Sequence, residues 1–185
     1  MKSLIYVAFH KPYGTVCQFS GEKPEETLAH FNLPKDIYPV GRLDKDSEGL
    51  LILSNDGQFI DQMLNPKNEK EKIYWSQVEN IPSEDSLNKL RAGGVKIENY
   101  KTAPARVQII YPDIPARNPP IRERKTVPTS WIELAITEGK NRQVRKMTAS
   151  INHPTLRLIR VKVGDFELGN LKSGEWVQIK KSDLL

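Results

Sequence analysis

The stretch that decides the fold is Gly41-Arg42-Leu43-Asp44-Lys45-Asp46-Ser47-Glu48-Gly49-Leu50-Leu51. It runs from a charged, turn-forming segment directly into an apolar strand predicted over Leu50 to Ser54. In an extended chain, side chains alternate between faces, and residues two apart lie roughly 6.6 Å from each other. Arg42 and Asp44 are therefore expected on one side, with Leu43 turned inward. A carboxylate between a turn and a buried strand, with an arginine beside it, is a candidate reaction site.

Working outward, the chain contains more predicted strand than helix. Asn55-Asp56-Gly57 turns into a helix that ends at Asn65-Pro66, with Asp56 as its N-cap. A second helix is predicted over Ser83 to Ala92, with Gly93 as its stop. Further strands are predicted over short apolar or alternating runs, namely Leu4 to Phe9, Thr15 to Phe19, Lys72 to Val78, Val95 to Ile97, Ala105 to Tyr111, Ser130 to Thr137, Leu156 to Val163 and Glu175 to Ile179. This order predicts an α+β fold with a largely antiparallel sheet.

The 185 residues, 38% of them apolar and 28% charged, are typical of one globular domain. We expect a single domain over 1–185, with an N-terminal lobe over 1–64 and a C-terminal lobe over 72–185. The longest apolar run near the N-terminus is Leu4 to Phe9, too short for a membrane span. Cys17 is the only cysteine, which excludes an internal disulfide and argues against a cysteine-based metal site. A cytoplasmic protein without a metal is therefore expected.

Positive charge gathers in the C-terminal half of a chain whose net charge is +5. Arg117 to Lys125 and Glu138 to Lys146 each hold four cations and one acid, so each nets +3. Arg157, Arg160 and Lys162 form a third cluster. Such clusters predict a phosphate-contacting surface, with ordinary solvated loops and strand faces as the alternative.

A basic helix is predicted over Asn141 to Ser150, started by Asn141. At 100° per residue, its apolar residues share one side, and its other side is cationic around a small residue. The apolar side holds Val144, Met147 and Ile151; the opposite side holds Arg142, Arg145, Lys146 and Ala149. The cationic side could approach a phosphate or a carboxylate closely.

Several common chemistries are excluded. On a helix, Asp44 and Asp46 would lie about 200° apart, so a helical segment could not place them as paired carboxylates across one bond. The sequence holds neither a phosphate-cradling Gly-x-x-x-x-Gly-Lys motif nor a Gly-x-Ser-x-Gly elbow.

Four motifs in order resemble those of the RsuA-like pseudouridine synthases. They are His10-Lys11-Pro12-Tyr13-Gly14, the run from Gly41 through Gly57, Lys72-Ile73-Tyr74, and Glu138 through Met147. The segment Arg117 to Lys125, with Pro128-Thr129-Ser130-Trp131, further resembles the subfamily that acts on 23S rRNA. Many relatives carry a small RNA-binding domain ahead of the catalytic one, and none is expected here, since the first strand begins by Leu4.

The resemblance implies a role for each matching residue. Asp44 matches the nucleophilic aspartate, Tyr74 the tyrosine that stacks on the target base, and Arg145 the basic partner of the aspartate. Arg42 matches the arginine that fills the gap left by the flipped nucleotide. Attack on the ribose, addition to the base and removal of a ribose proton are all compatible with Asp44. No cofactor, metal or ATP is implied.

The resemblance also implies the partner, which is 23S rRNA or a large ribosomal subunit precursor bound by a monomer. The predicted RNA contacts, besides Arg42, are Lys11, Arg117, Arg122, Arg124, Lys125, Lys140, Arg142 and Lys146. For Lys11, a role as a turn or pocket residue is the alternative.

Two other functions stay open. A non-catalytic rRNA-binding or ribosome-assembly protein would share the basic surface, but it has no reason to place a carboxylate within a phosphate-attracting groove. A nucleoside hydrolase would need a water-activating base, for which the sequence offers no candidate.

Overall fold

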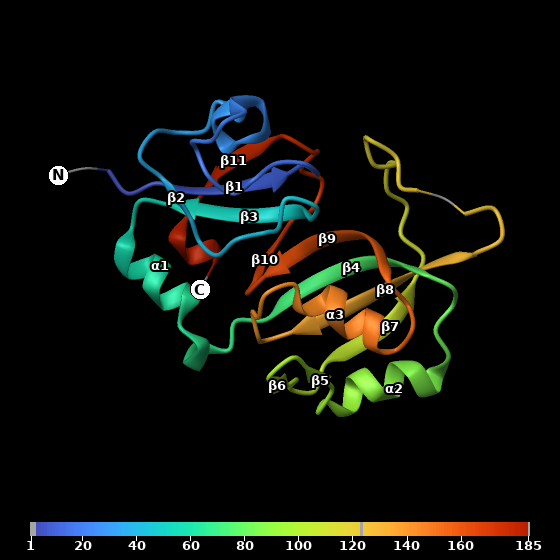
Figure 1. The fold of residues 1–185 in the computed structure, drawn as a ribbon. Coiled ribbons are helices and arrows are strands. Elements are labelled where there is room, and N and C mark those ends of the chain that lie inside the picture. The colour runs from blue at the N-terminus through green and yellow to red at the C-terminus, as the bar shows by residue number, and fades with distance from the viewer. Residues whose placement is uncertain (1–2, 123, 185) are drawn as a thin grey trace. The chain divides into compact units, whose positions relative to one another are not determined.

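The computed structural model describes residues 3–122 and 124–184 (Figure 1). The strands are β1 (Tyr6–Lys11), β2 (Tyr38–Pro39), β3 (Glu48–Ser54), β4 (Lys72–Glu79), β5 (Lys96–Ile97), β6 (Tyr100–Lys101), β7 (Arg106–Ile110), β8 (Thr129–Ile136), β9 (Thr155–Val163), β10 (Phe166–Glu167) and β11 (Trp176–Ile179). The helices are α1 (Gly57–Leu64), α2 (Glu84–Ala92) and α3 (Gln143–Ser150), with short 3-10 helices η1 (Pro24–Glu26), η2 (Leu28–Phe31), η3 (Pro66–Asn68) and η4 (Lys181–Asp183). This content confirms the α+β class.

The chain folds into two compact units. The first comprises Met1–Lys70 and Arg160–Leu185, and the second comprises Glu71–Ile159. The expected lobes had one boundary along the chain, near residues 65–71. The two units have two boundaries, and the second falls within β9, which begins in the second unit and ends in the first.

The first unit is built on an antiparallel arrangement in which β1 pairs with β11 on one side and β3 on the other. Both faces of β1 and β3 are covered, which explains why β3 is apolar almost throughout. Alternate residues point to opposite faces and enter two separate cores. One core holds Tyr6, Ala8, Leu50, Ile52, Phe59, Met63 and Leu184 among others, and the second holds Val7, Phe9, Leu28, Ile37, Leu51 and Leu53. In Figure 1, α1 and the two 3-10 helices η1 and η2 lie on opposite sides of the strands.

The N-cap predicted for α1 is confirmed. The Asp56 carboxylate accepts from the Phe59 N–H at 3.1 Å, and also from the Tyr6 hydroxyl at 2.7 Å. The Lys181 ammonium lies 3.0 Å from the same carboxylate. The start of the helix is thereby attached to β1 and to η4.

In the second unit, β4 pairs with β8 and β8 with β7, all antiparallel. Pro154 accepts from the Glu79 N–H at 3.0 Å, which attaches the start of β9 to the end of β4. Helix α2 begins at Ser83, whose hydroxyl accepts from the Ser86 N–H at 3.2 Å. Its residues Leu87 and Leu90 are buried.

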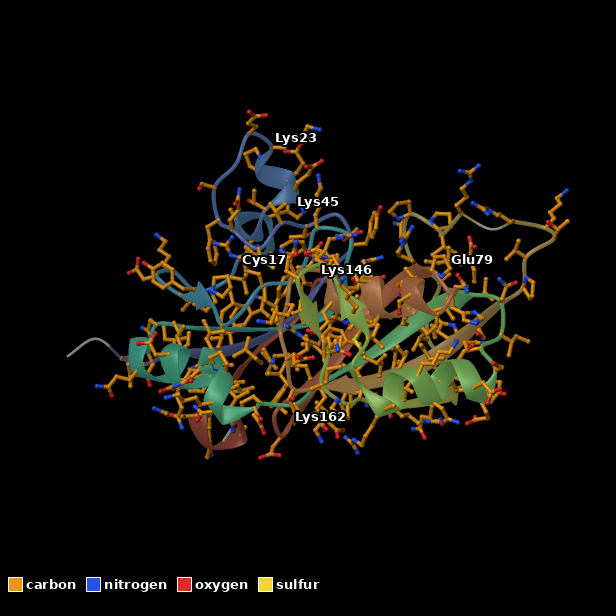
Figure 2. All side chains as sticks on the ribbon, turned by 60° about the horizontal axis from the view of Figure 1, so that its bottom comes forward. Cys17, Lys23, Lys45, Glu79, Lys146 and Lys162 are labelled. Carbon is orange, nitrogen blue, oxygen red and sulfur yellow. The ribbon has the colours of Figure 1, made fainter. Side chains whose placement is uncertain are left out.

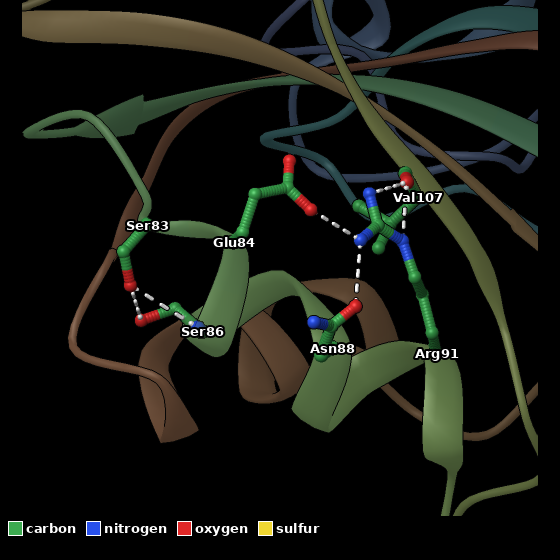
Figure 3. A network of polar contacts seen from close by, with 6 residues as sticks. All are labelled: Ser83, Glu84, Ser86, Asn88, Arg91 and Val107. Carbon is green, nitrogen blue, oxygen red and sulfur yellow. Dashed lines mark hydrogen bonds and ion pairs between the residues drawn. The ribbon is translucent and has the colours of Figure 1, made fainter.

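Figure 3 shows how α2 is fixed to β7. The Arg91 guanidinium donates to the Val107 carbonyl at 2.8 and 3.0 Å. A third nitrogen donates to Glu84 and Asn88, both at 2.7 Å. One side chain therefore joins two turns of the helix to the neighbouring strand.

Two local expectations were wrong. The segment Thr15 to Phe19 is not a strand, since Val16 makes only an isolated bridge with Thr27. Helix α3 begins at Gln143 with Arg142 as its N-cap in the left-handed region, so Asn141 does not start it. Within residues 3–122 and 124–184, no helix has the length and apolar character needed to cross a membrane.

Candidate active site

Asp44 lies in a turn that leads into β3. Its carbonyl accepts from the Ser47 N–H at 3.0 Å, and the strand begins at Glu48, two residues earlier than predicted. Arg42 is exposed, Leu43 is buried and Asp44 is half-buried. Leu43 is therefore turned inward as predicted, although these three residues form no strand.

The residues on either side of Asp44 are held by the first unit. Cys17 Sγ lies 3.2 Å from the Leu43 carbonyl oxygen and 3.3 Å from the Leu43 nitrogen. The Lys45 carbonyl accepts from the Gly14 N–H at 2.8 Å, and the Lys45 ammonium pairs with a Glu26 carboxylate, whose pKa it lowers. Cys17 and Lys45 are labelled in Figure 2. Asp44 is thus presented from a loop that is fixed at both neighbouring residues.

Lys11 is fully buried at the end of β1. Its ammonium donates to the carbonyls of Thr15 at 2.7 Å, Pro12 at 2.8 Å and Lys45 at 3.4 Å. Burial lowers the pKa of Lys11 to about 8, against the opposing effect of nearby acidic groups that include Asp44. This geometry favours the pocket role for Lys11, and its contact with RNA stays a prediction.

Gly49 allows two strands to approach closely beside this loop. Its φ is +106°, and a Cβ there would lie 2.3 Å from the Arg160 carbonyl oxygen. Gly49 also lies directly opposite Lys11 in the register of β1 and β3. Only glycine fits at this position without displacing backbone.

Arg160 is buried, which the sequence did not predict. Its side chain is 4% exposed and its Nε donates to the Leu50 carbonyl at 2.8 Å. Arg157 is 8% exposed, and its Nη1 donates to the Pro115 carbonyl at 2.8 Å. The third predicted basic cluster is therefore not a phosphate-contacting surface, and only Lys162 of its members is partly exposed, where it pairs with Glu167 at 3.2 Å.

The surroundings of Cys17 are cationic. Burial raises the pKa of its thiol, while the charges of Lys11, Arg160 and Arg42 act to lower it. These three cations and the loop that carries Asp44 belong to the same unit. The first unit therefore gathers positive charge near the loop of its candidate carboxylate.

In the second unit, Tyr74 lies on the buried face of β4 with Ser76 and Val78, as the alternation predicted. The Ser76 hydroxyl lies 2.9 Å from that of Thr155, which lies 2.7 Å from that of Thr148 in α3. Tyr74 therefore projects from the face of β4 that α3 covers.

Helix α3 has the predicted amphipathic pattern. Val144, Met147 and Ile151 are buried, and Ala149 is exposed on the other side. Its start depends on a residue that the sequence did not single out: the Gln143 side chain donates to Glu138 at 2.6 Å and accepts from the Lys140 N–H at 3.1 Å.

The cationic residues of this region differ in exposure. Lys140 and Arg142 are exposed, whereas Arg145 and Lys146 are half-buried. Lys146 is already paired with Glu98 at 2.6 Å. Lys140 and Arg142 are thus the more accessible of these predicted RNA contacts.

The segment from Pro112 to Pro128, which contains five prolines, forms no helix or strand among its described residues. Arg117 shapes the loop, since its guanidinium donates to the carbonyls of Pro119 at 2.8 Å and Pro120 at 3.2 Å. Arg124 lies 3.7 Å from Glu79, and Arg122 and Lys125 are exposed. Glu123, the acid counted in this segment, lies outside the described residues.

The predicted site residues divide between the units. Asp44, Arg42 and Lys11 belong to the first, and Tyr74, Arg145 and the other predicted RNA contacts belong to the second. The sequence placed Arg160 on the surface rather than in the interior. It did not single out two exposed lysines of the β5–β6 hairpin, Lys96 and Lys101. Over the described residues, no group of His, Cys, Asp and Glu side chains could hold a metal ion.

Residues 5–150 match the family model described as RNA pseudouridylate synthase. The chain is 47% identical to "Ribosomal large subunit pseudouridine synthase E" of Vibrio parahaemolyticus, over 94% of this chain and 73% of that protein. It is 49% identical to the protein of the same name in Xanthomonas axonopodis pv. citri, over 89% of this chain and 88% of that one. A solved structure titled "Crystal structure of pseudouridylate synthase" superposes with a TM-score of 0.81 at 26% identity, covering 100% of this chain and 74% of that one.

Proposed function

The chain belongs to the RNA pseudouridylate synthase family, and we propose that it converts one specific uridine of large-subunit (23S) rRNA to pseudouridine. The relatives named for the large ribosomal subunit support this choice of substrate, since the similarity covers most of both chains. The segment Arg117 to Lys125 supports the same choice, because it was the part of the sequence that resembled the 23S rRNA subfamily.

The proposed reaction is an isomerisation within one nucleotide. The bond from N1 of uracil to C1′ of ribose breaks, the base turns, and a bond from C5 to C1′ forms. The proton on C5 is lost and N1 gains a proton, so atoms and electrons balance without a cofactor.

In this proposal, Asp44 is the nucleophile. Two features of the first unit support the role: backbone bonds hold the residues on either side of Asp44, and cations gather near its loop. A nucleophile gains from such fixed positioning because less freedom is lost when the reacting atoms meet.

Tyr74 is proposed to stack on the flipped uracil, Arg145 to pair with Asp44, and Arg42 to fill the gap that the base leaves. Stacking on an aromatic ring contributes roughly 1 to 3 kcal/mol per base, which helps offset the few kcal/mol lost on unstacking. The placement of Tyr74 on the α3 face of β4 supports its pairing with a residue of α3 in one site. The exposed position of Arg42 is compatible with insertion into RNA.

The proposed grip on RNA combines the proline-rich segment with the start of α3. Arg122, Lys125, Lys140 and Arg142 are exposed and suit phosphate contacts. Arg117 is proposed to act differently, because its bonds to Pro119 and Pro120 shape the loop that carries Arg122. We place this activity in the cytoplasm, where a monomer would act on 23S rRNA or a large-subunit precursor.

The observation that carries the proposal is the half-buried Asp44 on its fixed loop within a chain of this family. The test is Asp44→Asn, which preserves size while removing the charge. Pseudouridine formation on 23S rRNA should be lost, while RNA binding should stay within about twofold. Asp46→Asn, two residues along the same turn, is the matched control and should retain activity.

The same experiment separates the alternative function. A non-catalytic rRNA-binding protein would bind the RNA but form no pseudouridine even as the wild type. Full activity of Asp44→Asn would contradict the assignment of Asp44, and inactivity of the wild type on both naked rRNA and subunit precursors would contradict the enzyme.

A further inference from the structure

The hairpin of β5 and β6 holds two lysines directly opposite each other. Lys96 pairs with Lys101 in the antiparallel register, so both side chains project from the same face. Both residues are exposed, and neither forms an ion pair within residues 3–122 and 124–184. Like charges placed directly across a strand pair destabilise it. The two lysines therefore do not contribute to the stability of the hairpin that carries them.

The other face of the hairpin fixes its position. Ile97 is 4% exposed, and the Tyr100 hydroxyl is buried. The Lys140 ammonium lies 5.5 Å from the centre of the Tyr100 ring, and Lys146 of α3 pairs with Glu98 in the hairpin turn. Figure 2 labels Lys146 at this point. The two lysines are thus held beside the basic start of α3.

We infer that Lys96 and Lys101 form a phosphate-binding surface that extends the RNA grip of α3 onto the β5–β6 hairpin. This inference rests on the proposed function, from which it takes RNA as the partner. A polyanionic backbone would relieve the repulsion between the two ammonium groups. This repulsion acts in the free protein and is reduced in the complex, so its relief favours binding. Lysine is a mobile point charge and suits backbone contacts that carry no base specificity.

An acidic protein surface is the competing partner. The structure favours RNA because the hairpin is joined to α3 by the Lys146–Glu98 ion pair, and its Tyr100 ring lies beside Lys140, a residue already proposed to contact RNA. The outer face of the hairpin offers no apolar side chain that a protein partner could bury, because the apolar Ile97 points inward.

The test is the double variant Lys96→Ala/Lys101→Ala. Its affinity for a 23S rRNA transcript would be measured between about 50 and 200 mM salt, the range over which released counterions dominate. Each lost phosphate contact reduces the slope of log affinity against log salt by about 0.7 to 0.9, so the pair should reduce it by roughly 1.5. Thermal unfolding should occur at or slightly above the wild-type temperature, because a repulsion is removed.

The control is Lys67→Ala/Lys89→Ala, which removes the same charge from two other exposed lysines. Its slope should match the wild type, and Lys96→Arg/Lys101→Arg should retain the wild-type slope as well. An unchanged slope in the hairpin variant, or an equal reduction in the control, would overturn the inference. The inference would also be overturned if the hairpin variant kept the wild-type slope for RNA but no longer bound a purified ribosomal protein. That result would assign the surface to a protein partner.

Failure of this inference can be told from failure of the proposed function. If the wild type forms pseudouridine but the hairpin slope is unchanged, only the hairpin surface is wrong. If the slope falls as expected but the wild type forms no pseudouridine, the hairpin surface stands and the proposed reaction is wrong.

Discussion

The Lys11 ammonium lies 3.4 Å from the carbonyl oxygen of Lys45, the residue that follows Asp44. The same ammonium binds two carbonyls of the turn after β1. A single buried cation therefore joins the end of a core strand to the loop that carries the candidate nucleophile. Lys11 therefore supports this loop, and its contact with RNA stays a prediction.

Replacing Lys11 with methionine should loosen this loop. The substitution keeps an unbranched side chain but leaves the carbonyls of Pro12 and Thr15 without their donor, while the Lys45 carbonyl still accepts from the Gly14 N–H. Each buried acceptor left unsatisfied costs about 1 to 3 kcal/mol. Removal of the cost of burying the charge offsets part of this, so we expect a net loss of about 2 kcal/mol in the free energy of unfolding at pH 7. Denaturant unfolding would measure it, and Lys23→Met, an exposed lysine of the same unit, should be neutral.

The pH dependence of stability should differ between these two proteins. The pKa of Lys11 is about 8 in the folded chain and has its ordinary value of 10.5 when unfolded, so the unfolded chain binds more protons between those values. Wild-type stability should therefore rise relative to Lys11→Met as the pH increases from 8 to 10.5, by up to about 3 kcal/mol. Parallel curves for the two proteins would show that Lys11 titrates normally.

Gly49 and Gly57 should respond in opposite directions to alanine. In Gly49→Ala the new Cβ would meet the Arg160 backbone at 2.3 Å in a residue with φ of +106°, and we expect a loss of at least about 3 kcal/mol or failure to fold. Gly57 is in the first turn of α1 with open space around its Cα, so Gly57→Ala should stabilise by about 0.5 kcal/mol. Soluble yield and thermal unfolding measure both, and a Gly49→Ala protein as stable as the wild type would refute the close approach.

The sequence predicted most of the framework because its local signals agree with the tertiary structure. Asp56 caps the helix that it was expected to cap, and the second helix begins one residue after its predicted start at Ser83. The alternating run predicted as a strand over Lys72 to Val78 forms β4 within one residue of those bounds. Each of these outcomes depends on residues within a few positions of one another, which a sequence pattern can represent.

What the sequence missed depends on distant partners. Arg160 was assigned to the surface by its charge, but it is buried, and its Nε donates to a carbonyl 110 residues earlier in the chain. The opposition of Lys96 and Lys101 likewise depends on the register of the hairpin. Neither the hydrogen bond of Arg160 nor the opposition of the two lysines can be predicted from the distribution of charge along the sequence.

Arg91 should be the main attachment of α2 to β7. Arg91→Ala removes the donors to Val107, Glu84 and Asn88, shown in Figure 3, and should lower the free energy of unfolding by about 1 to 2 kcal/mol. Denaturant unfolding provides the measurement, and Lys89→Ala on the same helix turn should change it by less than about 0.5 kcal/mol. An equal effect of the two substitutions would mean that the guanidinium adds nothing beyond its charge.

Asp56 should make the first unit sensitive to acid. The hydrogen bond from Tyr6, followed by the Phe59 N–H and Lys181, lowers the pKa of Asp56 to about 2 from its ordinary 3.8. A carboxylate with a lowered pKa contributes stability above its unfolded pKa and loses that contribution as the pH falls through its folded pKa. Asp56→Asn should therefore lower the thermal midpoint by several degrees at pH 7, and its difference from the wild type should shrink between pH 4 and pH 2. Asp61→Asn, an exposed carboxylate of the same helix, is the control, and a difference from the wild type that stayed constant down to pH 2 would contradict the role of the charge.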